Sequence, residues 1–196
     1  MTDGTIEVNP GQNQRLSKLV LPTETGSPRR KAMKCTLPIA INIEYLHKVK
    51  QQVLHPKKDI MPLEKAMDVM KLFVLKGKVQ TFTEKIFDND APFYQNEHKT
   101  DFKLWVTLID STGQMGATMF RAARAFTLSD VETMMGLWES CDTKEGREVF
   151  LEKLNAHAEE EMSYVCSAKV WAPSGDMDKK FEVVVQDVIS PESSSS

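Results

Sequence analysis

The chain has 196 residues, 41% of them hydrophobic and 27% charged, with a net charge of −3. It therefore suits one domain with tails and excludes a uniformly basic, histone-like binder. No apolar run reaches the roughly 18 residues that cross a membrane, the amino terminus lacks the pattern of a secretory signal, and three widely spaced cysteines without a CxxC pair indicate a reducing, intracellular compartment.

Residues 1–59 are predicted to form a basic amino-terminal arm that is largely extended or disordered. Ten lysines and arginines oppose two acids between residues 12 and 58, and most of this stretch has little periodicity. Residues 39–54 fit either a short helix or part of the extended arm. The segment Ser27–Lys31 (SPRRK) fits either a nuclear-localisation cluster or an ordinary solvated loop.

The compact domain is expected at residues 60–189, and its first long strand at Leu72–Thr83. Lys76 and Lys78 alternate with apolar residues in this strand, as in a sheet with one buried face. Gly77 in mid-strand predicts a bulge or the sharp bend that a small barrel needs.

The most informative stretch is Phe102–Phe120, which reads as a strand, a tight turn and a second strand. Apolar residues alternate with polar residues and Trp105 along the first strand. The turn at Asp110–Gly113 has the expected chemistry, because Asp bonds to nearby backbone and Gly tolerates positive φ.

A helical region follows the hairpin. Ser129 and Glu132 match a capping box, and an apolar stripe at helical spacing continues from Val131 to Trp138. A second helix, or an extension of the first, is expected over Glu145–Ala158.

Two more strands are predicted at Tyr164–Trp171 and Phe181–Val188, with a turn at residues 173–175 between them. Residues 190–196 are expected to be a disordered tail. Five strands with a helix between the third and fourth follow the order of an OB-fold barrel. The expected fold class is therefore all-β with accessory helices, built as a five-stranded OB-fold barrel.

A sheet face that shows aromatic rings among cations suits single-stranded nucleic acid, because bases stack on rings while phosphates attract Lys and Arg. We expect such contacts from the hairpin and its end, from the first strand, from two aromatics in the loop before the hairpin, and from the strand before the last turn. The predicted binding residues are Phe120, Arg121, Arg124, Lys103, Trp105, Lys78, Phe93, Tyr94, Lys169 and Trp171.

Each of these residues also has an ordinary structural interpretation. Phe120 could pack under the helix, Arg121 and Arg124 could lie in a solvated loop, and the lysines could be simple surface residues. An outward Trp171 is costly unless it packs or binds something. Three further phenylalanines are expected in the core, at Phe73, Phe82 and Phe181.

With this order of strands, the chain resembles the replication protein A large-subunit family, specifically its carboxy-terminal OB-fold. FKLWVTLIDSTGQMGATMF is similar to the family's Asp-led turn and V-T-x-F strand, and KKFEVVVQDVISP to its closing K-A-x-V-x-D-V strand. IEVNPGQNQRLSKL resembles the segment that leaves a preceding OB-fold. The resemblance implies a nuclear protein that binds single-stranded DNA, with Phe120 as a stacking aromatic and other replication protein A-like subunits as partners.

The sequence departs from this family at three places. The family carries a four-cysteine zinc ribbon after the first strand, whereas Phe93-Tyr94-Gln95-Asn96 lacks its first cysteine and the insert is short, so no zinc site is expected. Gly116 stands where the family usually presents a second stacking Trp, for which Trp105 or Trp171 could substitute. A helix like the one that assembles the family's trimer is not expected after the last strand.

An enzyme is not expected, because the chain contains no GxSxG, HExxH or P-loop motif and no GxGxxG after a strand. No cofactor is expected either. The predicted function is single-stranded DNA binding in replication, repair or recombination. Two alternatives stay open: an OB module that has lost DNA binding and serves as a protein-interaction scaffold, and RNA binding.

Overall fold

The computed structural model describes residues 38–173 and 178–191. The SPRRK cluster, most of the predicted turn at 173–175 and the tail from residue 192 lie outside these ranges. A compact unit begins at Pro38. Its elements are β1 (Ile39–Ile41), α3 (Ile43–Leu54), α4 (Leu63–Lys71), β2 (Phe73–Val79), the 3-10 helix η1 (Glu84–Asp88), β3 (Phe93–Asn96), β4 (Lys99–Phe102), β5 (Leu104–Asp110), β6 (Gly113–Met119), α5 (Ala122–Thr127), α6 (Val131–Glu139), α7 (Lys144–Leu154), β7 (Met162–Trp171) and β8 (Lys180–Ile189).

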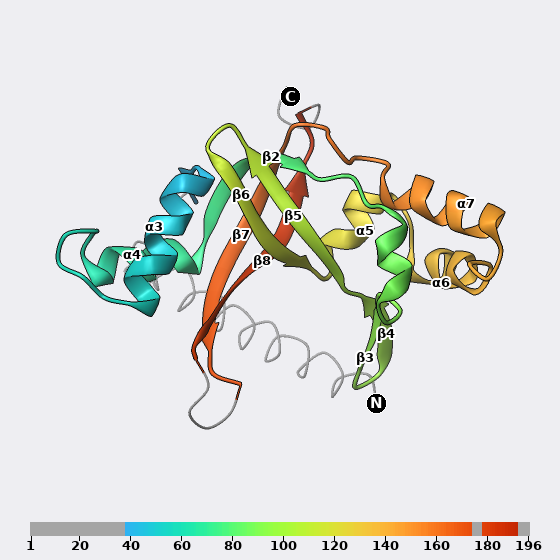
Figure 1. The fold of residues 1–196 in the computed structure, drawn as a ribbon, viewed down its shortest axis with the longest axis horizontal. Coiled ribbons are helices and arrows are strands. Elements are labelled where there is room, and N and C mark those ends of the chain that lie inside the picture. Colours follow the sequence, from blue (N-terminus) through green and yellow to red (C-terminus); the bar gives the residue numbers. More distant parts are fainter. Residues whose placement is uncertain (1–37, 174–177, 192–196) are drawn as a thin grey trace, which may run out of the picture. The chain divides into compact units, whose positions relative to one another are not determined.

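The unit is mostly β with accessory helices. Six strands form one sheet in the order β1-β2-β5-β6-β8-β7, and β3 and β4 form a separate hairpin. Strand β2 also pairs antiparallel with β7, so the order β2-β5-β6-β8-β7 returns to β2 (Figure 1). The predicted β5–β6 hairpin is confirmed, and helices α5–α7 lie between β6 and β7 along the chain, as predicted.

Gly77 lies where β2 changes partners. Residues 73–77 of β2 pair with β7, and the next two residues pair with β5. A Cβ added at Gly77 would clash with the Ile109 carbonyl oxygen, so any other residue would push β2 and β5 apart. The predicted need for glycine here therefore comes from a close approach of two backbones.

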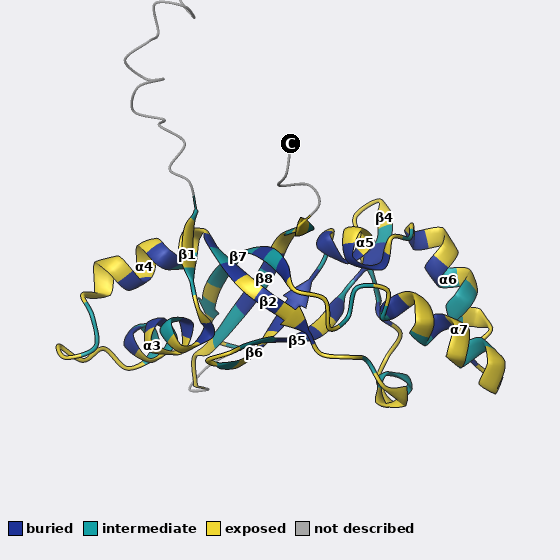
Figure 2. Ribbon diagram, turned by 90° about the horizontal axis from the view of Figure 1, so that it is seen from above, coloured by how far each residue is buried: buried dark blue, intermediate teal, exposed yellow. Residues whose placement is uncertain are grey.

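The predicted domain boundary at residue 60 falls inside the compact unit, because residues 39–54 form β1 and α3 and pack on it. Strand β1 pairs parallel with β2, and α3 buries Ile43, Leu46 and Val49 on one face. Helices α3 and α4 lie at one end of the sheet, and α5–α7 with the β3–β4 hairpin lie at the other (Figure 1). Figure 2 shows alternating buried and exposed segments along these helices, which is the pattern of elements packed by one face.

The β5–β6 turn caps the amino terminus of α3. Asp110 Oδ2 accepts a hydrogen bond from Ile43 N at 2.8 Å, and Thr112 Oγ1 accepts one from Glu44 N at 3.0 Å. Asp110 Oδ1 at the same time accepts bonds from the backbone N–H groups of Thr112 and Gly113. Two of the amide donors that a helix leaves unpaired at its start are thus satisfied from a turn distant in sequence.

Helix α6 begins at a different cap from the predicted one. The side chain of Asp130 accepts a bond from Thr133 N at 2.7 Å, so Asp130 is the N-cap and the prediction of Ser129 was wrong. Ser129 donates its hydroxyl to the Thr127 carbonyl at 3.2 Å instead. Within the described ranges, no helix is both long and apolar enough to cross a membrane.

Asp110→Asn is expected to lower the free energy of unfolding by about 1–3 kcal/mol. The asparagine carbonyl can accept from Thr112 and Gly113, but its amide then turns a donor towards the Ile43 N–H. Urea denaturation measures the change, with exposed Asp59→Asn as the matched control. An unchanged midpoint for Asp110→Asn would contradict the cap.

The same cap predicts a pH dependence. Partial burial, the largest single influence, raises the pKa of Asp110, but the bonds from Thr112, Ile43 and Gly113 together hold that pKa below its ordinary value of 3.8. A carboxyl group with a depressed folded-state pKa adds stability above its unfolded pKa and loses it as the pH falls through the folded pKa. The stability difference between the parent chain and Asp110→Asn should therefore shrink on acidification below about pH 5.

Candidate nucleic-acid interface

Trp105 is the most exposed aromatic side chain on the sheet. The predicted alternation holds along β5, where Leu104, Val106 and Leu108 are buried. Trp105 lies between them on the opposite face and is 61% exposed. A large exposed apolar ring on a regular strand is the arrangement that a stacking partner would cover.

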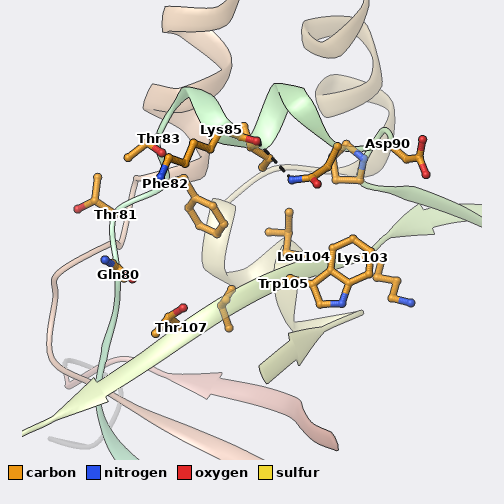
Figure 3. Close-up of a pocket in the computed structure, with 14 residues that line it drawn as sticks. Gln80, Thr81, Phe82, Thr83, Lys85, Asp90, Lys103, Leu104, Trp105 and Thr107 are labelled. Atoms are coloured by element: carbon orange, nitrogen blue, oxygen red, sulfur yellow. Dashed lines mark hydrogen bonds between the residues drawn. The ribbon is translucent and has the colours of Figure 1, made fainter. Parts of the chain in front are cut away.

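Two hollows flank Trp105. The first lies between β5 and the segment that follows β2, and Figure 3 shows Phe82, Lys85 and Trp105 among its lining side chains. The second crosses β5, β6 and β8, and Trp105, Val106 and Thr107 belong to the linings of both. The lining of the second hollow also includes Gly116, Thr118, Trp171, Lys180 and Glu182.

Four of the predicted residues meet around Lys103. Its Nζ lies 4.9 Å from the centroid of the Trp105 ring and 5.8 Å from that of the Phe120 ring. Tyr94 packs edge-on against Phe120, with 5.4 Å between ring centroids. These contacts join a cation and three rings at one end of the hairpin, and we call Trp105, Lys103, Phe120 and Tyr94 the Lys103 cluster.

The two arginines after β6 have different surroundings. Arg124 forms an ion pair with Asp101, with Nη2 3.1 Å and Nε 3.3 Å from Oδ1. The Asp101 side chain is 11% exposed, so Arg124 neutralises a buried carboxylate. Arg121 is exposed. Burial and the Asp101 carboxylate raise the pKa of Tyr94, and Arg121 and Arg124 oppose that shift, which places both arginines beside the Lys103 cluster.

The other predicted residues lie apart from that cluster. Trp171 is 42% exposed and lines the second hollow, while Lys169 pairs with Glu182 at 3.2 Å. Lys78 lines neither hollow and lies 3.8 Å from a Glu159 carboxylate oxygen.

Phe93 is partly buried and packs against the core. Its ring lies 5.0 Å from that of Phe102 and 6.4 Å from that of Trp138. These contacts occupy part of the Phe93 ring surface, and a base-stacking role for Phe93 stays a prediction.

Residues that were not predicted also line the hollows. Lys180 lies 5.5 Å from the Trp171 ring centroid, and its outward parity on β8, opposite buried Val183, could have identified it. Phe82, predicted in the core, is only partly buried and lines the first hollow. Lys85 lies on the short helix η1, and nothing in the local sequence pattern distinguishes it.

An aromatic cluster holds η1 and the β3–β4 hairpin against the helices. Phe87 stacks on Trp138 at 5.7 Å, and Trp138 packs edge-on against Phe150 at 5.3 Å. Arg147 covers Phe87 at 5.1 Å. The wall of the first hollow thus rests on packed rings contributed by η1, α6 and α7.

The described residues include no group of three or more His, Cys, Asp or Glu side chains that could hold a metal ion. Burial raises the pKa of Cys166 to about 12 and also raises the pKa of Cys141. Both thiols are buried, so neither has the lowered pKa of a catalytic nucleophile.

No family model matches the chain, and no curated protein matches it. Among solved structures, a chain of a replication protein A heterotrimer bound to single-stranded DNA aligns with a TM-score of 0.51 and 12% identity. The alignment covers 77% of this chain and 36% of that chain, so the present chain spans about a third of its length. A chain of yeast replication protein A bound to single-stranded DNA aligns with a TM-score of 0.49 and 14% identity, over 80% of this chain and 90% of that one.

At 12% identity, the first of these likenesses shows the fold alone. The chain has an OB fold like that of replication protein A, with accessory helices around a sheet of several strands.

The pairing of Arg124 predicts a structural role that Arg121 lacks. Arg124→Ala is expected to lower the free energy of unfolding by about 1–3 kcal/mol, because Asp101 is left buried without its charged partner. Arg121→Ala, a matched change three residues away, should alter it by less than about 0.5 kcal/mol. Chemical denaturation of both variants tests this, and equal effects would contradict it.

Proposed function

We propose that the chain binds single-stranded DNA across the outer face of β5 and β6, as a binding protein and not an enzyme. The observation that carries this proposal is the exposed Trp105 ring between two hollows, with Lys103 beside it. Rings on which bases stack, combined with cations along the backbone path, are what unspecific single-strand binding requires.

The topology supports the same face. We infer that the ring β2-β5-β6-β8-β7 is the five-stranded OB-fold barrel, with β1 as an added strand. In that fold, strands 2 and 3 and the loops between strands 1 and 2 and between strands 4 and 5 hold oligonucleotides. Here those strands are β5 and β6. The first hollow lies on the side of the β2–β5 connection, and the second reaches Trp171 at the end of β7.

The corresponding family domain, the cellular process and the compartment are proposals as well. We infer that the chain corresponds to the carboxy-terminal OB-fold of the replication protein A large subunit and acts in DNA replication, repair or recombination in the nucleus. It would hold unstacked bases and keep a strand from re-pairing, with other replication protein A-like subunits as partners. The RNA-binding alternative has no support from the two neighbours, which are both described with single-stranded DNA.

The scaffold alternative rests on a specific observation. Three of the predicted cations already have carboxylate partners: Lys78 pairs with Glu159, Arg124 with Asp101, and Lys169 with Glu182. A protein-interaction module needs no free cations on this face, whereas a DNA-binding groove does.

Four cations near the hollows decide between these functions. Lys85, Lys103, Arg121 and Lys180 have no carboxylate partner in the part of the chain that the structure describes. Titration of a fluorescent oligodeoxynucleotide of mixed base sequence and about 15 nucleotides should show binding whose logarithmic salt slope is about −3, as expected for about four neutralised phosphates. An absence of binding at low salt would overturn the proposal and favour the scaffold function.

Trp105→Ala is expected to weaken this binding by about 1–3 kcal/mol, since one stacking platform is removed. Phe120→Ala should also weaken it, because the Phe120 ring shares Lys103 with Trp105. Met67→Ala removes a comparably exposed apolar side chain from α4, outside both hollows, and serves as the control. If Trp105→Ala binds as tightly as the parent chain, the assigned face is wrong even where DNA binding itself holds.

A further inference from the structure

A carboxylate lies in the second hollow, where a groove for a polyanion would be expected to exclude one. The hollow has a volume of about 430 Å³ and is flanked by Trp105 and Trp171. Glu182 of β8 is the acidic side chain in its lining, and its side chain is 24% exposed. A carboxylate offers a phosphate no hydrogen-bond donor, so phosphate contacts in this hollow would fall to Lys180 and not to Glu182.

The Glu182 carboxylate is held from two sides. One oxygen, Oε1, accepts the Thr118 hydroxyl at 3.2 Å, and the other, Oε2, lies 3.2 Å from Lys169 Nζ. The residue is braced by β6 and β7 together, which fixes the direction of both oxygens. An ionised carboxylate has about four acceptor sites and no donor, so Thr118 and Lys169 leave acceptor capacity on a side chain that lines the hollow.

The floor of the hollow is open beside this acceptor. A Cβ added at Gly116 would meet no heavy atom within 4 Å, so a planar group can approach the β6 backbone there. Trp105 and Trp171 supply ring faces on the same lining. A flat ligand with a donor on its edge fits this set of surfaces.

We propose that the second hollow is a base-selective subsite, in which Glu182 accepts a hydrogen bond from the amino group of a base that lies against Trp105 or Trp171. This inference rests on the proposed single-stranded DNA binding. Cytosine, adenine and guanine carry amino donors, whereas thymine presents the O4 acceptor where cytosine presents N4–H₂. Thymine offers the N3–H donor alone, which lies between its O2 and O4 acceptors, and these acceptors would face the carboxylate oxygens. The subsite therefore favours amino-bearing bases over thymine.

Oligocytidylate and oligothymidylate of equal length make the sharpest comparison, because the two pyrimidines are similar in size and differ at position 4. Oligomers of about 15 nucleotides are titrated at slightly alkaline pH, which keeps cytosine neutral. The parent chain should bind oligocytidylate about fivefold or more tightly than oligothymidylate. In Glu182→Gln the ratio should fall to near one, since an amide offers both a donor and an acceptor and accommodates either base.

Glu161→Gln is the matched control. Glu161 also lies 3.2 Å from a lysine, Lys76, but it lines neither hollow. This variant removes the same charge and should keep the preference of the parent chain, and thermal melting confirms that both variants are folded.

The possible results of these titrations distinguish failure of the base-selective subsite from failure of the proposed DNA binding. Tight binding of both oligomers with no preference in the parent chain overturns the subsite and leaves DNA binding standing. Equal strengthening of both oligomers by Glu182→Gln also overturns it, because the carboxylate then acts only by repulsion. No binding of either oligomer at low salt overturns the proposed function together with the inference.

Discussion

The double pairing of β2 is the constraint on which the rest of the structure depends. Five residues of β2 pair with β7 and the next two pair with β5, and the change of partner takes place at Gly77, where the Ile109 carbonyl leaves no room for a Cβ. This closure makes the strand order return on itself. Within that order β5 pairs with β6 and β6 with β8, and Trp105 and Trp171, far apart in the chain, line one hollow.

Some charged side chains on this face are free to contact a ligand, and others are held in ion pairs. Three cations that the sequence pattern predicts as phosphate contacts form ion pairs with carboxylates instead. The pairs are Arg124 with Asp101, Lys78 with Glu159 and Lys169 with Glu182. An ion pair satisfies both partners, so such a cation gains less from a phosphate than a free one does. The proposed interface accordingly depends on ring stacking at Trp105 and on a small set of free cations, and the same bracing orients Glu182 for a role that the charge alone would not suggest.

The wall of the first hollow is held by apolar packing. Phe87, Trp138 and Phe150 come from η1, α6 and α7 and contact one another at ring distances of 5.3–6.0 Å. Burying such rings stabilises the short segment that carries η1 and the β3–β4 hairpin. The short β3–β4 hairpin is thereby placed so that Tyr94 reaches Phe120, while Phe93 of the same strand is drawn into the cluster.

The sequence by itself determined the features that depend on neighbouring residues. Period-2 alternation located β2, the β5–β6 hairpin, β7 and β8, and the parity of β5 placed Trp105 outward, because side-chain direction in a strand follows from position alone. It did not determine that residues 39–54 join the domain, since the first amides of α3 are capped by Asp110, 67 residues away from Ile43. Nor did it determine which cations are free or that the Phe93 ring packs against Phe102 and Trp138. Only the tertiary structure decided these three features. A salt bridge or a ring contact forms between side chains that are distant in sequence, and folding alone brings such side chains within reach of each other.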